Sequence, residues 1–451
     1  MRIFWMALFF LGCAAVLPQG LRAADGQLGT SRADKGPLET INIAQPLAGE
    51  QQQAERPVPP SFPANGKSET ETIPDTDVRN RAHLVQINWE RTYGNTAADH
   101  LHSWTIMPDG GLLMAGKTNA VPTGPSNAWL VCTDAQGQLL WQKNFGNSDT
   151  DYARDLLSLT DGNFLMLGNQ FSENNGRYNL WLVKLDPAGN ILWQKNYGGE
   201  RNEYARSIMA TPDGNFLISG ATESKGAGSF DVWLLKIDGE GNLLWDKTFG
   251  GTEYERAPIL AMAEDGQFYL AGATQSKGAG QSDAWLLKFK ANGKLRWEKT
   301  YGGAGYETIN DFIFMPNGDF LLAGTTSTPG IQDSNGWFLR GSSDGKLLWE
   351  KNVGGAGKEA ANALLALPDG GILAGGIKHA AGDPESDAWL LRMDAKGKFL
   401  WEVTMGQKPS SESISHLALL PDGQVLVLAE ITVGGNSNLD ANLMKIALSE
   451  D

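Results

Sequence analysis

Residues 193–199 read Trp-Gln-Lys-Asn-Tyr-Gly-Gly, and residues 245–251 read Trp-Asp-Lys-Thr-Phe-Gly-Gly. The two stretches lie 52 residues apart, and the tryptophan that opens them returns at this interval along most of the chain. This first tryptophan series comprises Trp89, Trp141, Trp193, Trp245, Trp297, Trp349 and Trp401. A fixed period of this length indicates a repeat architecture in which each repeat is one unit of supersecondary structure.

A second tryptophan series and a series of turns share this period. The second series comprises Trp129, Trp181, Trp233, Trp285, Trp337 and Trp389. The turns resemble Pro212-Asp213-Gly214, and runs rich in Leu, Ile, Phe and Trp flank them. Such runs around Asp-Gly turns are typical of β-hairpins, because the turn needs the positive φ that glycine adopts easily. Four strands per repeat match a propeller blade, so the sequence predicts an all-β fold of four-stranded antiparallel blades.

The two ends of the repeat predict how the ring closes. The first repeat begins with a lone strand at 84–92, and the last stops after its third strand at 442–448. We therefore expect residues 82–451 to form a seven-bladed β-propeller in which the N-terminal strand completes the last blade. Asn442 replaces a seventh tryptophan of the second series, so this blade should be the least well packed. Both tryptophan series are expected to lie in the core.

The N-terminal segment predicts export. Residues 1–23 combine Arg2 with an apolar run and small residues, which is typical of a signal peptide. Cys13 leaves open a lipid anchor instead. Residues 24–81 are rich in Pro, Gln and Glu and poor in large apolar groups, which predicts a disordered spacer. We expect a secreted, periplasmic or cell-surface protein with no transmembrane span after the leader.

The overall charge limits the possible partners. The formal net charge is -15, which argues against nucleic acid, because binding it needs clustered Lys and Arg. A mature chain that begins after residue 23 retains one cysteine, Cys132, so no intrachain disulfide is expected. We expect a monomer that binds a protein or a glycan.

The stretch from Trp193 to Gly199, together with Asp231-Val232-Trp233-Leu234-Leu235-Lys236, resembles the β-propeller repeats of secreted and cell-surface bacterial proteins. This resemblance covers the whole chain after residue 82. The pattern Asp-x-x-Gly-x-Leu-Leu-Trp at 238–245 is also similar to the tryptophan-docking repeat of propellers of the pyrroloquinoline-quinone type. Those enzymes have eight blades and a vicinal cysteine pair, which this sequence lacks. The resemblance therefore implies a propeller but no particular activity.

Two polar series follow the repeat and are candidate binding residues. The first comprises Asp99, Asp151, Glu203, Glu255, Glu307, Glu359 and Glu412. The second comprises Asn127, Asn179, Asp231, Asp283, Asn335, Asp387 and Asp440. One interpretation is a ring of oxygen ligands for Ca²⁺ or an acidic face for a cationic partner. The other is that these side chains accept backbone N–H bonds in their own loops, because a feature present in every repeat is explained by the building of blades.

Positions at which the repeats differ are better candidates for a specific site. His102, Asp155 and His416 occupy such positions on the inner strands, and ring closure should bring His416 beside His102. These three residues are the candidate catalytic group, although polar residues also line wet channels without any such role. We expect a non-catalytic binding or scaffold propeller that presents an acidic loop face to a protein or glycan. The alternative is a hydrolase or lyase with its site at the channel mouth.

Overall fold

The computed structural model describes residues 69–71, 82–95, 97–119, 124–146, 150–172, 176–328, 330, 333–355, 357–379, 382–383, 385–406, 410–432 and 439–449. The expected signal peptide, Cys13 and most of the expected spacer lie outside these residues. Within the expected spacer, Glu69–Glu71 forms a short strand, β1. No helix in the described ranges is long and apolar enough to cross a membrane. The account below concerns the compact unit Ala64–Asp451.

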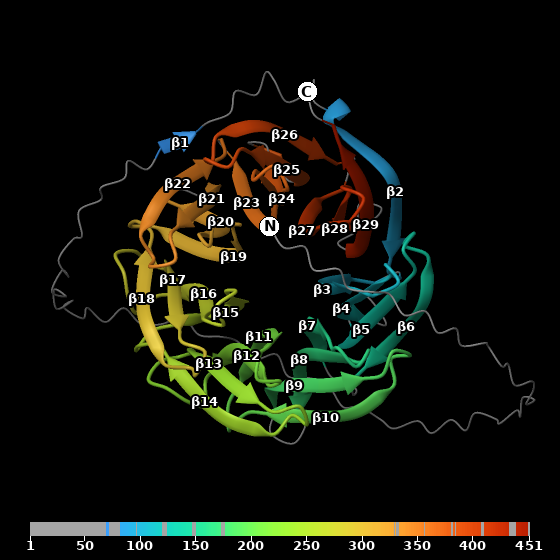
Figure 1. Ribbon diagram of the computed structural model, residues 1–451, viewed down its shortest axis with the longest axis vertical. Helices are drawn as coiled ribbons and strands as arrows, with labels where there is room; N and C mark the ends of the chain where they lie inside the picture. The colour runs from blue at the N-terminus through green and yellow to red at the C-terminus, as the bar shows by residue number, and fades with distance from the viewer. Residues whose placement is uncertain are drawn as a thin grey trace, which may run out of the picture. The chain divides into compact units, whose positions relative to one another are not determined.

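The chain from Ala82 onward forms a ring of four-stranded antiparallel units (Figure 1). After a 3₁₀ turn at Ala82–Leu84, the strands are β2 (Val85–Tyr93), β3 (Asp99–Ile106), β4 (Leu112–Asn119), β5 (Ser126–Thr133), β6 (Leu139–Phe145), β7 (Tyr152–Ser158), β8 (Phe164–Ser172), β9 (Arg177–Leu185), β10 (Ile191–Tyr197), β11 (Glu203–Ala210), β12 (Phe216–Thr222), β13 (Asp231–Ile237), β14 (Leu243–Phe249), β15 (Glu255–Met262), β16 (Phe268–Thr274), β17 (Asp283–Phe289), β18 (Leu295–Tyr301), β19 (Tyr306–Phe314), β20 (Phe320–Ser327), β21 (Ser334–Gly341), β22 (Leu347–Val353), β23 (Lys358–Ala366), β24 (Ile372–His379), β25 (Asp387–Met393), β26 (Phe399–Met405), β27 (Glu412–Leu419), β28 (Val425–Thr432) and β29 (Leu439–Leu448). The inner strands β3, β7, β11, β15, β19, β23 and β27 lie around the centre of the ring, and residues from each of them line a central cavity.

The expectation of an all-β propeller with four-stranded antiparallel units is confirmed, but the expectation of seven separate blades is wrong. Five separate four-stranded sheets are present, and β19–β26 belong to one nine-stranded sheet that also includes β1. A parallel bridge from Ser334 to Lys358 joins β21 to β23 and merges these sheets. The corresponding bridges from Phe230 to Tyr254 and from Ser282 to Tyr306 are isolated. Two neighbouring sheets therefore join into one where both residues of the bridge belong to strands, as Ser334 and Lys358 do.

The expected closure by the N-terminal strand is confirmed. Strand β2 pairs antiparallel with β29, from Val85 opposite Leu448 to Tyr93 opposite Ala441. Asn442 stands where other units have a buried tryptophan, and its Nδ2 donates to Glu90 Oε1 at 2.6 Å. Its Oδ1 is buried without a hydrogen-bond partner. Weaker packing of this unit stays a prediction.

The two tryptophan series differ in burial, which corrects the expectation that both lie in the core. The second series is buried, as for Trp233 and Trp389, and packs among the apolar side chains between adjacent sheets. The first series is only half-buried. Trp193 instead packs on Gly241, a turn residue of the next unit where a Cβ would lie 2.9 Å from the indole. The first series therefore docks one unit onto the next.

Candidate functional site

Each inner strand has an irregularity in its pairing with the next strand, at the same place in the repeat. For example, the register shifts between Ala153 and Asp155 in β7, so that Arg154 is the additional residue. Such β-bulges redirect a side chain and are common beside functional sites. The residues at these bulges that line one central cavity of about 350 Å³ are His102, Arg154, Arg206, Asn310, Asn362 and Ser415.

In part of the ring these side chains bind the neighbouring unit. Asn310 Nδ2 donates to the carbonyl of Ala361 at 3.1 Å, and Asn362 Nδ2 donates to the carbonyl of Ile414 at 3.2 Å. His102 Nδ1 lies 3.2 Å from the carbonyl of Ala153, the same position one unit on. Because a buried carbonyl needs a donor, these bonds stabilise the ring itself.

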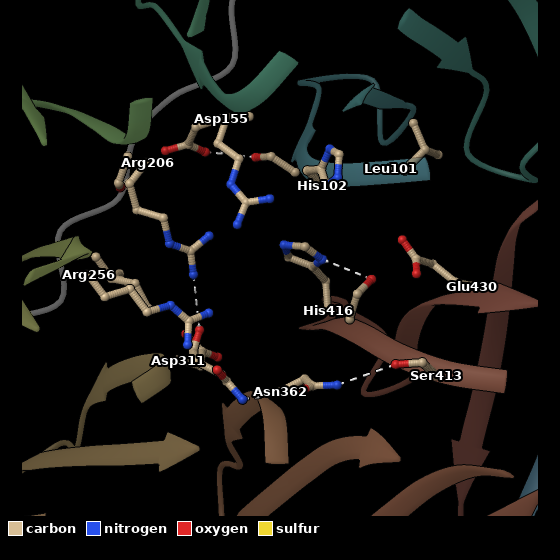
Figure 2. A pocket seen from close by; sticks show the side chains of 16 residues that line it. Leu101, His102, Asp155, Arg206, Arg256, Asp311, Asn362, Ser413, His416 and Glu430 are labelled. Atoms are coloured by element: carbon tan, nitrogen blue, oxygen red, sulfur yellow. Dashed lines mark hydrogen bonds between the residues drawn. The ribbon is translucent and has the colours of Figure 1, made fainter. Parts of the chain in front are cut away.

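Three arginines in the same cavity are not used in this way. Arg154 and Arg206 occupy bulge positions, and Arg256 comes from the following inner strand, two residues before Pro258. Figure 2 shows the side chains of Arg206 and Arg256 extending into the cavity. Arg206 has one long contact, from Nη2 to the carbonyl of Asn310 at 3.5 Å. Among the described residues, no carboxylate forms an ion pair with any of the three.

The positive charges of the arginines repel one another. Burial and the neighbouring guanidinium groups of Arg154 and Arg256 lower the pKa of Arg206 to about 9. Burial also lowers the pKa of Arg154, while Asp155 and Glu430 oppose this change. Because a pKa of about 9 lies above neutral pH, Arg206 is protonated there. The cavity therefore concentrates positive charge without a matching ion pair.

Two half-buried carboxylates beside the cavity accept hydrogen bonds from backbone N–H groups. Asp155 accepts hydrogen bonds from Ser103 Oγ at 2.8 Å and from the backbone N–H of Leu156 at 2.9 Å and of Ile208 at 2.8 Å. Asp311 accepts from the corresponding backbone N–H groups of its own and the next inner strand. Burial raises the pKa of Asp155 and raises that of Asp311 to about 6. These carboxylates join inner strands together.

The structure places His102, Asp155 and His416 around one cavity, as the sequence suggested, but as separate groups. His416 Nδ1 lies 3.1 Å from Ser415 Oγ, and the bonds of Asp155 go to Ser103 and to backbone groups. Burial and the charges of Arg206 and Arg154 lower the pKa of His416 to about 4. Burial likewise lowers the pKa of His102. Both histidines are therefore neutral at pH 7, and their recorded bonds do not form a carboxylate–histidine relay.

The candidate acidic series lies inside the loops. Each of its members is buried: Asp99, Asp151, Glu203, Glu255, Glu307, Glu359 and Glu412. Glu203, for example, accepts from the backbone N–H of Gly199 at 3.1 Å and from Thr222 Oγ1 at 3.1 Å. These contacts correspond to the structural interpretation of the series, because a partner could reach the carboxylates only by opening the loops.

The second polar series meets the first at an equivalent glycine in several repeats. A Cβ at Gly250 would lie 2.0 Å from Asp231 Oδ1 and 2.6 Å from Glu255 Oε2, so only glycine fits between the two side chains. The two series thus pack across one glycine. In the described part of the chain, no group of three or more His, Cys, Asp or Glu side chains is placed to hold a metal ion. The Ca²⁺ site stays a prediction.

A second recess, of about 290 Å³, shares the three arginines with the central cavity. It is lined by Tyr152, Tyr204 and Tyr254, with Arg154, Arg206 and Arg256. These arginines and tyrosines were not among the site residues predicted from the sequence. The sequence contains one signal for them. Arg256 stands at the position that Tyr152 and Tyr204 occupy in the two preceding units, and Pro258 stands at the position of the bulged arginines.

Comparisons with known proteins support the fold. No family model matches the chain. It is 23% identical over 194 residues to regulatory protein FlaEY of Caulobacter vibrioides, and the match spans 36% of this chain but only 20% of the length of that protein. Among solved structures, an ulvan lyase from a new polysaccharide lyase family has a TM-score of 0.53 at 11% identity, covering 79% of this chain and 96% of the lyase. Polysaccharide lyase Uly1 has a TM-score of 0.50 at 12% identity, covering 79% and 92%. At these identities the likeness concerns the fold alone.

Proposed function

We propose that this protein is a non-catalytic binding module whose central cavity receives an anionic group of a protein or glycan partner. The observation that carries the proposal is the convergence of Arg154, Arg206 and Arg256, which form no ion pair with a carboxylate in the described part of the chain. Like charges held together in a partly buried cavity disfavour one another, and a bound anion would remove that repulsion. Guanidinium groups also match carboxylate, phosphate and sulfate with paired hydrogen bonds.

The proposal places binding in a basic cavity and not on an acidic face. The repeated carboxylates are buried in their loops, whereas the arginines line an open cavity. The negative net charge does not oppose this, because local charge decides what a cavity attracts. Action in a secreted or envelope compartment stays part of the proposal.

The alternative of a hydrolase or lyase is less well supported. His102 and His416 are neutral and could accept a proton, but Asp155 is hydrogen-bonded to Ser103 and to two backbone N–H groups. A general base without an orienting partner is a weak arrangement for catalysis. Binding needs only the arginines.

The proposal is tested by thermal unfolding of the full chain in sodium sulfate and in sodium chloride at equal ionic strength. A ligand that binds only the folded state raises the unfolding temperature, so sulfate should stabilise the wild type more than chloride does. Arg206→Gln should lose this difference. Arg201→Gln, which removes an exposed arginine outside the cavity, should retain it. An equal sulfate effect in the wild type and in Arg206→Gln would contradict the proposal.

A further inference from the structure

A continuous arc of aromatic rings runs beside the three arginines. The aromatic arc consists of Tyr152, Tyr178, Tyr204, Phe230 and Tyr254, from three consecutive units. Successive ring centroids lie 6.3, 5.7, 5.5 and 5.7 Å apart. At one end of the arc, the ring of Tyr152 lies 6.5 Å from the ring of His102. The arc therefore runs around the ring from one unit to the next.

Two members of the arc replace a residue that the ring uses elsewhere. At the position of Tyr178 and Phe230, other units have a serine whose hydroxyl donates to a carbonyl of the next unit. Ser126 Oγ donates to the carbonyl of Asp151 at 3.1 Å, and Ser334 Oγ donates to that of Glu359 at 3.2 Å. The two aromatic side chains cannot make this bond. Their presence is thus not explained by the assembly of the ring.

The arc and the arginines meet in one recess. Tyr152, Tyr204 and Tyr254 line it together with the three guanidinium groups. Tyr254 is 42% exposed, and Tyr152, Tyr178, Tyr204 and Phe230 are partly exposed. Aromatic faces that solvent can reach thus lie beside unpaired positive charges.

These two features suit one kind of ligand. An aromatic ring packs well against the C–H groups of a flat, uncharged ring face, through dispersion and removal of apolar surface from water. The arginines need an anionic group on the same ligand. A sugar ring that bears an acid group offers both within one residue, and a chain of such sugars repeats them along the arc.

We infer that the aromatic arc and the three arginines form a binding site for an acidic glycan, with sugar rings stacked on the arc and acid groups at the arginines. This inference rests on the proposed anion-binding function and names its ligand class. A nucleic acid is less well matched, because it needs clustered Lys and Arg along its backbone, whereas the basic residues of this site are the three arginines of one recess.

The test is calorimetric titration of the full chain with tetragalacturonic acid. The matched variant is Tyr178→Ser/Phe230→Ser, which restores the serine that other units have. Loss of two stacking contacts should weaken binding about tenfold or more. Tyr306→Ala removes an exposed tyrosine of the next unit outside the arc and should bind like the wild type. Because the double variant could misfold, its unfolding temperature is measured, and Tyr254→Ala at the exposed end of the arc is a second variant.

Two further ligands distinguish the source of the acid group. The methyl ester of tetragalacturonic acid keeps the sugar rings but loses the charge, so it should bind much more weakly. A sulfated galactan oligosaccharide tests whether sulfate esters replace carboxylates. Binding of either acidic glycan that depends on the arc supports the inference.

The outcomes separate the inference from the function on which it rests. If sulfate stabilises the protein through Arg206, but neither acidic glycan loses affinity in the serine variant or in Tyr254→Ala, the inference is overturned and the anion site stands. If polyglutamate binds as tightly as the glycans and with the same dependence on the arc, the ligand is an acidic peptide and the inference is also overturned. Absence of any arginine-dependent sulfate effect would overturn the proposed function itself.

Discussion

Two sets of three units, called halves below, use the same bulge position for different purposes, and the unit of β3 belongs to neither. In the asparagine half, the units with inner strands β19, β23 and β27, the side chains of Asn310 and Asn362 hold the neighbouring unit. In the arginine half, with inner strands β7, β11 and β15, Arg154 and Arg206 stand at these positions and Arg256 joins them. This difference shows that the ring closes without a hydrogen bond between units at every bulge. The side chains at the remaining bulges are therefore free to contact a ligand.

The largest expected effect should be the same in both halves, because they share the tryptophan core. Trp233→Ala in the arginine half and Trp389→Ala in the asparagine half each remove a side chain that is at most 2% exposed. Each should lower the free energy of unfolding by about 3–5 kcal/mol. Denaturant titration measures both values. A cost confined to one half would show that the halves differ in packing as well as in chemistry.

The next effect compares the two half-buried carboxylates of Asp155 and Asp311. Asp155→Ala and Asp311→Ala each leave backbone N–H groups of two adjacent inner strands without an acceptor. Each should cost about 2–4 kcal/mol of stability, and Asp155→Ala also deprives Ser103 of its acceptor. Chemical unfolding of both variants checks this. Retained stability in Asp155→Ala would indicate that Asp155 has a function other than joining strands.

A smaller change in stability, of opposite sign, is expected when an arginine of the arginine half is replaced by the asparagine of the other half. Arg206→Asn removes one of three like charges, so in chloride the protein should gain on the order of 1 kcal/mol of stability. The same variant should no longer respond to sulfate. Thermal unfolding in both salts gives the two answers. Loss of stability in chloride would mean that Arg206 supports the ring and is not held against repulsion.

The smallest effect concerns the seam between the ends of the ring. Burial and the charge of Asp99 raise the pKa of Asp440 from 3.8 to about 6. The folded state therefore binds more protons than the unfolded state between these values, and stability falls as the pH rises through this window. The arginine half has Asn179 at the same position. Asp440→Asn should thus stabilise the protein above pH 6 by less than about 1 kcal/mol.

Unfolding temperatures at a pH above 6 and at a pH well below 3.8 check this sign. The gain in Asp440→Asn should disappear at the lower pH, where Asp440 is protonated in both states. Asn179→Asp, which places a second carboxylate beside Glu203, is the reverse change and should destabilise only at the higher pH. A gain that does not depend on pH would point to a cause other than charge.

The repeat predicted the strands, the turns and the closure because each depends on local signals. The tryptophan period and the Asp-Gly turns identified hairpins, and the phase of the ends predicted the pairing of β2 with β29. The number of separate sheets was not predictable in this way. It depends on whether Ser334 and Lys358 both continue their strands, which is a small local difference.

The site was predictable only in part. Closure of the ring correctly placed His416 near His102, because both lie on inner strands that flank the seam. The convergence of the three arginines was not predicted. It depends on the bulges that turn Arg154 and Arg206 toward the cavity, and on Arg256 lining the same cavity from a different position in its strand. The prediction that both tryptophan series are buried was wrong for the first series. The pattern of residues along an outer strand does not show that Trp193 packs on a turn of the next unit.

The pairing of β2 with β29 also determines how the ring responds to tension. Val85 pairs with Leu448, so the two ends of the ring emerge side by side at one end of this strand pair. A force that pulls these ends apart acts on the terminal pair first and then on each following pair, up to Tyr93 and Ala441. The hydrogen bonds are therefore loaded one after another and not all together. A ring that heat must disrupt as a whole should open at low force when it is pulled by its two ends.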